Sequence, residues 1–108
     1  MAQRRIPKRI VNTVRNYRKR LEEDAVFVER ILVYGSHAKG TAREQSDIDV
    51  CVISPSFSDP ISALAFLLKR RNQAEVLAGL EPVGFTPKDF REGSSLINEI
   101  KRTGIPVN

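Results

Sequence analysis

Apolar residues recur at three- and four-residue steps near the start of the chain. They are Ile6, Ile10, Val14, Tyr17 and Leu21. Because an α-helix completes one turn every 3.6 residues, this spacing places all five on one stripe. The pattern predicts an amphipathic helix over about residues 7–23, with Pro7 in its first turn.

Two runs rich in apolar and β-branched residues follow this helix. Residues 26–34 contain Val, Ile and Phe with imperfect alternation, which indicates a strand buried on both faces at its centre. Residues 47–53 predict a second strand. Between the two, Gly35 permits a sharp turn, Ser36 is placed to cap a short helical turn through residue 39, and Gly40 suits its left-handed end.

The pattern then predicts a second long helix and a third strand. The helix covers about residues 61–77, with Ser58 or Asp59 as its cap, and its polar middle over residues 69–72 is expected in solvent. The strand begins at Leu80 and ends near Phe85. Pro82 cannot donate to a β-ladder and therefore confines this strand to an edge or a bulge.

Helix signals also occur at the end of the sequence. Thr86, followed by Pro87 and Asp89, indicates a helix start, and a last helix is expected over about residues 94–102. Helices and strands thus alternate along the whole chain. This order predicts one α/β (α+β) domain over residues 1–108.

The composition fits one soluble domain. The 108 residues are 41% hydrophobic and 29% charged, and the longest apolar stretches fall far short of the roughly 20 residues that span a bilayer. No apolar run with a cleavage site follows the amino terminus, so we expect no signal peptide, a cytoplasmic location and no membrane contact. The single cysteine, Cys51, cannot form an internal disulfide and is expected to be a small buried thiol.

The net charge of +5 is unevenly distributed. Residues 1–21 carry no acid and eight basic residues: Arg4, Arg5, Lys8, Arg9, Arg15, Arg18, Lys19 and Arg20. The remainder has ten basic and thirteen acidic residues, a net charge of −3. This distribution argues against a globally basic nucleic-acid module. The basic helix face is interpreted either as a solvated surface or as a contact for RNA or an acidic partner.

The most specific chemical signal is Gly35-Ser36, placed ten residues ahead of Asp47-Ile48-Asp49. In a strand, Asp47 and Asp49 would point to the same face, about 7 Å apart along the chain, and could share a divalent metal. An Asp-x-Asp pair alone often just begins a strand or closes a turn. A calcium-binding EF-hand is excluded in practice, because the twelfth position from Asp47 is Ser58 where a glutamate is needed.

Together these residues resemble the DNA polymerase β-like nucleotidyltransferase superfamily, in particular its minimal nucleotidyltransferase (MNT) branch. The resemblance rests on Tyr34-Gly35-Ser36 and Ser46-Asp47-Ile48-Asp49, and segments 80–90 and 100–105 are similar to the usual ends of such proteins. It implies a short mixed sheet flanked by helices. The basic helix would cover about residues 7–23, the metal and phosphate core 33–53, and the third strand with the closing helices 80–104.

The resemblance also implies roles for individual residues. Gly35 and Ser36 would hold the triphosphate of an NTP, since a hydroxyl beside backbone N–H groups at a helix start favours phosphate. Asp47 and Asp49 would bind Mg²⁺ or Mn²⁺. A third catalytic and metal-binding carboxylate comes from a later strand in that family. The best candidate here is Glu81, with Glu75 as the alternative.

The chain departs from the family in the turn after the serine. Arginines are common there, whereas this sequence has His37 and Lys39, which lack a bidentate guanidinium fork. His37 is interpreted as either a triphosphate contact or an exposed turn residue. Lys39 and Arg43 either steer phosphate or are simply solvated.

The implied activity is transfer of a nucleoside monophosphate from ATP or another NTP to a hydroxyl, with release of pyrophosphate. Small MNT proteins are often paired with a helical HEPN protein as a toxin–antitoxin system, so we expect AMP transfer to such a partner. The alternative is a non-catalytic or weakly catalytic subunit that retains the fold and binds a partner. An apolar helix face on so small a domain also makes a homodimer plausible.

Overall fold

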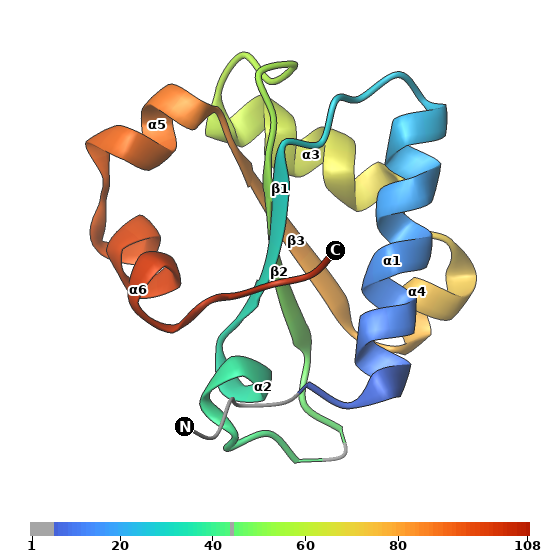
Figure 1. Ribbon diagram of the computed structural model, residues 1–108. Coiled ribbons are helices and arrows are strands. Elements are labelled where there is room, and N and C mark those ends of the chain that lie inside the picture. Colours follow the sequence, from blue (N-terminus) through green and yellow to red (C-terminus); the bar gives the residue numbers. More distant parts are fainter. Residues whose placement is uncertain (1–5, 44) are drawn as a thin grey trace.

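The computed structural model describes residues 6–43 and 45–108, and it places a four-stranded mixed sheet between two helical layers (Figure 1). The strands are β1 (Arg30–Tyr34), β2 (Ile48–Ile53), β3 (Leu80–Phe85) and β4 (Ile105–Pro106). The helices are α1 (Lys8–Glu23), α2 (Ser36–Lys39), α3 (Pro60–Lys69), α4 (Gln73–Leu77), α5 (Pro87–Glu92) and α6 (Ser95–Thr103). This architecture confirms the expected short mixed sheet flanked by helices.

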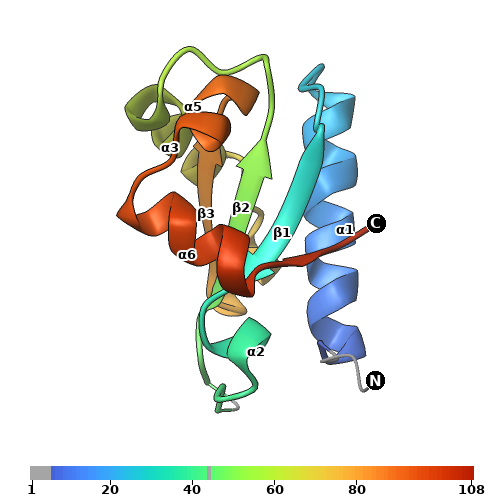
Figure 2. The ribbon, with the colours of Figure 1, turned by 60° about the vertical axis from the view of Figure 1, so that its left-hand side comes forward.

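The strand order is β3-β2-β1-β4. β1 pairs antiparallel with β2 and β4, whereas β2 and β3 are parallel and are joined by the α3–α4 crossover. β3 therefore lies at an edge of the sheet, as its proline predicts. α1 and α3 pack on one face, and α5 and α6 pack on the other (Figures 1 and 2).

Helix α1 agrees with the apolar stripe in the sequence. Ile10, Val14, Tyr17 and Leu21 are at most 1% exposed, and the Tyr17 hydroxyl donates to the Leu67 carbonyl at 2.7 Å, which ties α1 to α3. The basic side of α1 is partly engaged. Arg15 and Arg18 donate to backbone carbonyls of the last two residues. Arg4 and Arg5 lie outside the described residues.

The first strand is shorter than the sequence predicts. β1 begins at Arg30 rather than near residue 26, although Val26 and Val28 are still buried in the core. Phe27 and Glu29 between and after these two valines are exposed, so only alternate residues pack inward before β1, whereas residues 31–34 are all buried. The lone Cys51 is fully buried in the middle of β2, as predicted.

The predicted helix over residues 61–77 is wrong in one respect, because the chain forms two helices with a break at residues 70–72. The side chain of Asn72 accepts from the Glu75 N–H at 2.8 Å, and the Glu75 carboxylate accepts from the Asn72 N–H at 2.9 Å. This reciprocal capping box starts α4 as a new helix. The expectation that residues 69–72 are all solvated is also wrong, since the Arg71 side chain is only 20% exposed.

Helices α3, α5 and α6 begin at side-chain caps, close to the starts that the sequence predicts. Asp59, Thr86 and Ser94 accept from the backbone N–H three residues later, at 2.8, 3.0 and 3.2 Å. The sequence pattern missed β4, whose two residues pair with the middle of β1. Among the described residues, no helix is long and apolar enough to cross a membrane.

Candidate active site

Three side chains form a row across the sheet at the end nearest α2. Tyr34 on β1 lies opposite Asp49 on β2, and Asp49 is in register with Glu81 on β3. Directly paired residues of neighbouring strands point to the same face of a sheet. For this row it is the face covered by α5 and α6, while Ile48 and Val50 are buried in the core on the opposite face. The fold thus brings together two of the predicted carboxylates, Asp49 and Glu81.

Gly35 brings the backbone of the turn against Asp49. Its φ of 74° and ψ of −149° lie in a region that essentially only glycine adopts. A side-chain carbon on Gly35 would overlap Oδ2 of Asp49 and lie 3.2 Å from its Cγ. The turn between β1 and α2 can therefore contact the carboxylate only because residue 35 has no side chain.

Asp47, which the sequence predicts as the first residue of the second strand, lies immediately before β2 and is exposed. The backbone of Gly79 supports it: the Ile48 N–H donates to the Gly79 carbonyl at 2.8 Å. A side-chain carbon on Gly79 would lie 2.9 Å from Oδ1 of Asp47. A second glycine thus allows close approach of the backbone to the second aspartate.

The negative charges in the row act on one another. Burial raises the pKa of the Asp49 carboxyl, and the charges of Asp47 and Glu81 raise it further, while His37 opposes them. Burial also raises the pKa of the Tyr34 hydroxyl above its usual range, and the charge of Asp49 adds to this effect. Ionised Asp49 is therefore held in an environment that a nearby cation would stabilise.

These residues fit a divalent metal in their donor chemistry. Carboxylate oxygens are the ligands that Mg²⁺ prefers, and a divalent cation would offset the mutual repulsion that raises the pKa of Asp49. Within the described ranges, no three His, Cys, Asp or Glu side chains are grouped closely enough to hold a metal ion. Metal binding by Asp47, Asp49 and Glu81 stays a prediction.

Helix α2 carries three of the predicted phosphate contacts, Ser36, His37 and Lys39. Ser36 is the first residue of α2 and Gly35 is its N-cap. The prediction that Ser36 caps this helix is therefore wrong. Gly40 ends it in the left-handed conformation, with φ of 77°. Among the described residues, the Ser36 hydroxyl makes no hydrogen bond. Ser36 is partly exposed, and it follows Gly35, whose backbone lies against Asp49.

The basic residues of the turn differ in their surroundings. His37 is 5% exposed, with Nε2 3.4 Å from the Ser46 carbonyl, so it is not an exposed turn residue. Lys39 is exposed, and its Nζ lies 3.6 Å from the Glu99 carboxylate on α6. The Arg43 N–H donates to the Ser46 hydroxyl at 2.8 Å, which closes the loop before Asp47. Their roles in phosphate binding stay predictions.

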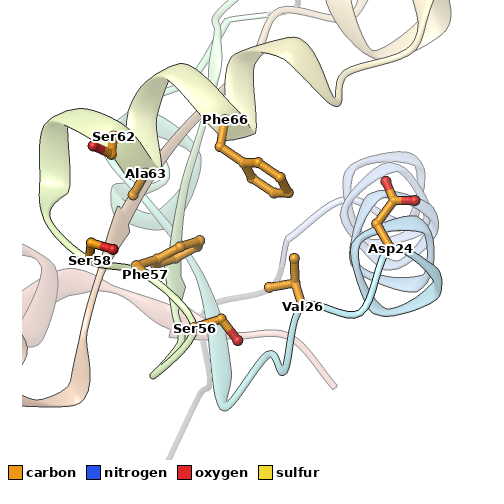
Figure 3. A pocket seen from close by; sticks show the side chains of 8 residues that line it. All are labelled: Asp24, Val26, Ser56, Phe57, Ser58, Ser62, Ala63 and Phe66. Atoms are coloured by element: carbon orange, nitrogen blue, oxygen red, sulfur yellow. The ribbon is translucent and has the colours of Figure 1, made fainter.

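A separate hollow of about 340 Å³ lies at the other end of the sheet (Figure 3). Its lining residues come from the α1–β1 connection, the β2–α3 loop and α3: Asp24, Val26, Ser56, Phe57, Ser58, Ser62, Ala63 and Phe66. Phe57, Phe66 and Val26 supply much of its apolar wall. None of the predicted site residues lines it, so the carboxylate row is the better candidate for chemistry.

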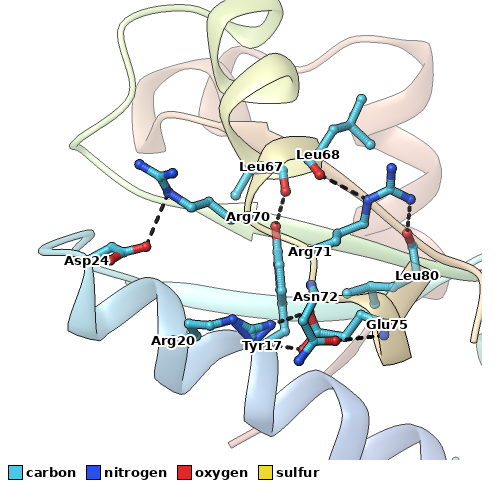
Figure 4. A network of polar contacts seen from close by, with 10 residues as sticks. All are labelled: Tyr17, Arg20, Asp24, Leu67, Leu68, Arg70, Arg71, Asn72, Glu75 and Leu80. Carbon is cyan, nitrogen blue, oxygen red and sulfur yellow. Dashed lines mark hydrogen bonds and ion pairs between the residues drawn. The ribbon is translucent and has the colours of Figure 1, made fainter. Parts of the chain in front are cut away.

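Glu75, the alternative third carboxylate, lies in a different environment (Figure 4). It is 3% exposed, accepts the Asn72 N–H, and pairs with both terminal nitrogens of the Arg20 guanidinium. Its oxygens thus join α1 to α4. Glu81, not Glu75, is the carboxylate in register with Asp49.

Replacing Arg20 with methionine is expected to destabilise the fold, because it leaves the buried Glu75 carboxylate without its cation. Breaking a fully buried pair costs about 3–5 kcal/mol. The Arg20 side chain is 30% exposed, so we expect the free energy of unfolding to fall by about 2 kcal/mol. Urea denaturation of R20M measures this. K19M, which removes an exposed cation from the same helix, is the control, and equal stability of the two variants would contradict a role for the pair.

Sequence reasoning missed three residues beside the row. Gly79 lies between α4 and β3, and its backbone lies against Asp47. Glu99 on α6 pairs with Lys39, and its charge raises the pKa of Asp49. Arg71 reaches Glu81 from the α3–α4 break, with Nη1 3.6 Å from Oε2. Only Gly79 carries a signal in the sequence, because it is a glycine next to a strand. The contacts of Glu99 and Arg71 depend on how distant elements pack, which the sequence pattern does not show.

Comparison with solved structures shows the same fold in proteins of low sequence identity. A toxin–antitoxin with AMP-PNP has a TM-score of 0.61 and 23% identity, covering 91% of this chain and 72% of that chain. A protein from Sulfolobus solfataricus described as a candidate nucleotidyltransferase has a TM-score of 0.64 and 10% identity. The match covers 91% of this chain and 78% of that chain. A doubly substituted mutant of the toxin–antitoxin MntA-HpeT has a TM-score of 0.57 and 18% identity. The match covers 87% of this chain and 70% of that chain.

A search of curated proteins gave no match. The model of the nucleotidyltransferase domain family, however, matches residues 14–105, a range that contains the whole carboxylate row, both aspartates and the turn before α2. The resemblance drawn from the Gly-Ser and Asp-x-Asp spacing is thereby confirmed. The chain is a nucleotidyltransferase and belongs to the nucleotidyltransferase domain family.

Proposed function

We propose that this nucleotidyltransferase moves AMP from ATP to a hydroxyl group on a partner protein, in a reaction that needs Mg²⁺ or Mn²⁺. The observation that carries the proposal is the pairing of Asp49 with Glu81 across β2 and β3, next to a glycine turn that contacts Asp49. Two carboxylates in register beside a turn fit a site where a triphosphate and a divalent metal meet.

In this proposal Asp47, Asp49 and Glu81 hold the metal, which neutralises charge on the phosphates and on the leaving pyrophosphate. Glu81 accepts the proton of the acceptor hydroxyl. It is suited to this because its side chain is 50% exposed and therefore accessible to an acceptor. The Ser36 hydroxyl and the N–H groups beside it donate to phosphate oxygens, and the exposed Lys39 ammonium on the same helix steers the triphosphate.

The choice of ATP and of a protein acceptor is supported by the structural neighbours. One of them is a toxin–antitoxin with AMP-PNP, an ATP analogue, and another is the toxin–antitoxin MntA-HpeT. We propose a helical HEPN-family protein as the partner. Ile61 is 82% exposed and Leu77 is 79% exposed, so apolar side chains are available on α3 and α4 for such a contact or for a second copy of the chain.

The same exposed side chains favour a second candidate function. The chain would then act as a partner-binding subunit with little or no transfer activity. The two functions differ in one measurable respect, which is whether nucleotide becomes covalently attached to the chain or to a bound protein.

Incubation with α-³²P-labelled ATP, Mg²⁺ or Mn²⁺ and a co-purified partner separates the two functions. The enzymatic function predicts label on the partner or on the chain itself, with release of pyrophosphate. The same reaction with labelled GTP, CTP and UTP tests the choice of base. Tight partner binding without transfer from any of the four nucleotides would leave the partner-binding function instead.

Replacing Ser36 with alanine is expected to weaken ATP binding without unfolding the chain. The change removes one hydrogen bond to a charged phosphate, worth about 1.5–3 kcal/mol, so the dissociation constant should rise roughly 10- to 100-fold. Isothermal titration with a non-hydrolysable ATP analogue measures it. The control is S95A, a serine at the exposed start of α6. Unchanged affinity in S36A would remove this hydroxyl from the site.

A further inference from the structure

Arg71 is fixed at the free edge of the sheet, between α3 and α4 (Figure 4). Its Nε donates to the Leu68 carbonyl at 3.2 Å, and its Nη1 donates to the Leu80 carbonyl at 3.0 Å. The side chain is 20% exposed. The two acceptor carbonyls lie at the end of α3 and at the start of β3. Because both hold the guanidinium, its orientation is restricted.

The same Nη1 lies 3.6 Å from Oε2 of Glu81. This distance is too long for a hydrogen bond, so the contact is one of charge. Glu81 follows Leu80, whose carbonyl anchors the arginine, and it belongs to an edge strand with a neighbouring strand on one side only. Arg71 therefore supplies a fixed positive charge on the open side of a half-exposed carboxylate.

Glu81 needs such support more than Asp49 does. Asp49 is packed against Gly35 and is flanked by strands on both sides, whereas the Glu81 side chain is longer and 50% exposed. Like charge on Asp49 repels the Glu81 carboxylate, and a long exposed side chain loses rotamer freedom when it is held. A fixed cation beside Glu81 offsets both the repulsion from Asp49 and the entropy cost of holding the side chain.

We propose that Arg71 is a positioning residue for Glu81: its anchored guanidinium holds the third carboxylate where it can act together with Asp49. The inference rests on the proposed function, because the role of Glu81 does. It goes beyond that function by giving Arg71 a role in metal binding and transfer that is separate from its role in joining α3 to β3.

The test compares R71M with R70M. Arg70 is the matched control because it is the adjacent arginine, and its guanidinium pairs with Asp24 at 3.2 Å and lies over the Phe66 ring, close to the separate hollow and not to the row. Mn²⁺ binding, measured by electron paramagnetic resonance, gives a readout that does not depend on turnover. We expect R71M to weaken Mn²⁺ binding by about 10-fold, the lower end for a residue that orients a metal ligand. R70M should bind Mn²⁺ as the unmodified chain does.

A double-mutant cycle with E81Q separates positioning from a structural role. If Arg71 acts through Glu81, R71M has no further effect on Mn²⁺ binding once Glu81 is replaced. Equal weakening by R71M in both backgrounds, or unchanged or tighter Mn²⁺ binding in R71M, would overturn the proposal. If thermal melting shows that R71M is unfolded, the same cycle with R71Q replaces it, because glutamine removes the charge and keeps an amide donor for a backbone carbonyl.

The transfer reaction adds a second readout. R71M should lower kcat for nucleotidyl transfer about 10-fold and leave KM for ATP within about twofold, because Glu81 and not the triphosphate loses its support. A change confined to KM would contradict a positioning role. If the unmodified chain shows no transfer at all, the proposed function fails, and the Mn²⁺ cycle still decides whether Arg71 positions Glu81.

Discussion

Asp49→Asn is expected to reduce nucleotidyl transfer by at least about 100-fold, since residues that only orient metal ligands already contribute about 10- to 100-fold to affinity or activity. Asparagine keeps the shape of the side chain and removes its charge, so the proposed metal loses a central ligand. Asp47→Asn should have a similar effect. Transfer of labelled nucleotide under single-turnover conditions measures the loss.

The same substitution should leave the metal-free chain as stable as before, or slightly more stable. The pKa of Asp49 is raised in the folded chain by burial and by the charges of Asp47 and Glu81. A carboxyl with a raised folded-state pKa binds its proton more tightly when folded, so its ionisation costs stability as the pH rises through that pKa. Asparagine removes this cost at neutral pH. Urea denaturation of D49N at pH 7 with a metal chelator tests this, and strong destabilisation would contradict it.

Asp59→Asn is the matched control for this prediction. Asp59 is exposed and caps α3 through the Ser62 N–H, at the end of β2 opposite to the row. Asparagine is also a good helix cap, so D59N should retain both stability and transfer. Retained transfer in D49N, or equal loss in D59N, would exclude a specific role for Asp49.

Gly35→Ala is expected to disable the site and to destabilise the fold. The backbone conformation of Gly35 costs about 1–3 kcal/mol for a residue with a side chain. The added carbon would also overlap the Asp49 carboxylate, so either the turn or the aspartate must move. Because misplacement of a catalytic group by about 1 Å can cost about 100-fold in rate, we expect a loss of transfer of that order.

Gly93→Ala separates the two effects of this change. Gly93, at the end of α5, has φ of 84° and ψ of 167°, in the same region of backbone conformation, but its neighbour is the Asn98 side chain on α6. G93A should therefore lower the melting temperature much as G35A does and still transfer nucleotide when assayed well below that temperature. Similar transfer by the two alanine variants would show that contact with Asp49 is unimportant.

The elements that the sequence predicted well are those with a local cause. Helix α1 follows from its regular apolar stripe, and α3, α5 and α6 begin at side chains that cap their first turns. The break before α4 also has a local cause, the Asn72–Glu75 capping box, but the apolar pattern runs through it and favours one helix. In this case a capping signal decided the structure and the periodicity did not.

The features that could not be predicted depend on residues far apart in the chain. The register that places Glu81 beside Asp49 arises from parallel pairing of β2 and β3 through a two-helix crossover. The two-residue strand β4 has too few residues to show a pattern. His37 is buried, with Nε2 of its ring 3.4 Å from the Ser46 carbonyl, a contact that a turn sequence does not reveal.

The position of Cys51 in the middle of β2 has a practical consequence for spectroscopy. Burial raises the pKa of its thiol to about 12, and because the thiolate is the reactive form, maleimides and iodoacetamides should not label it at neutral pH. The chain contains no other cysteine. A cysteine introduced at an exposed site, for example in place of Lys101 on α6, would therefore carry a fluorophore or spin label without any removal of native thiols.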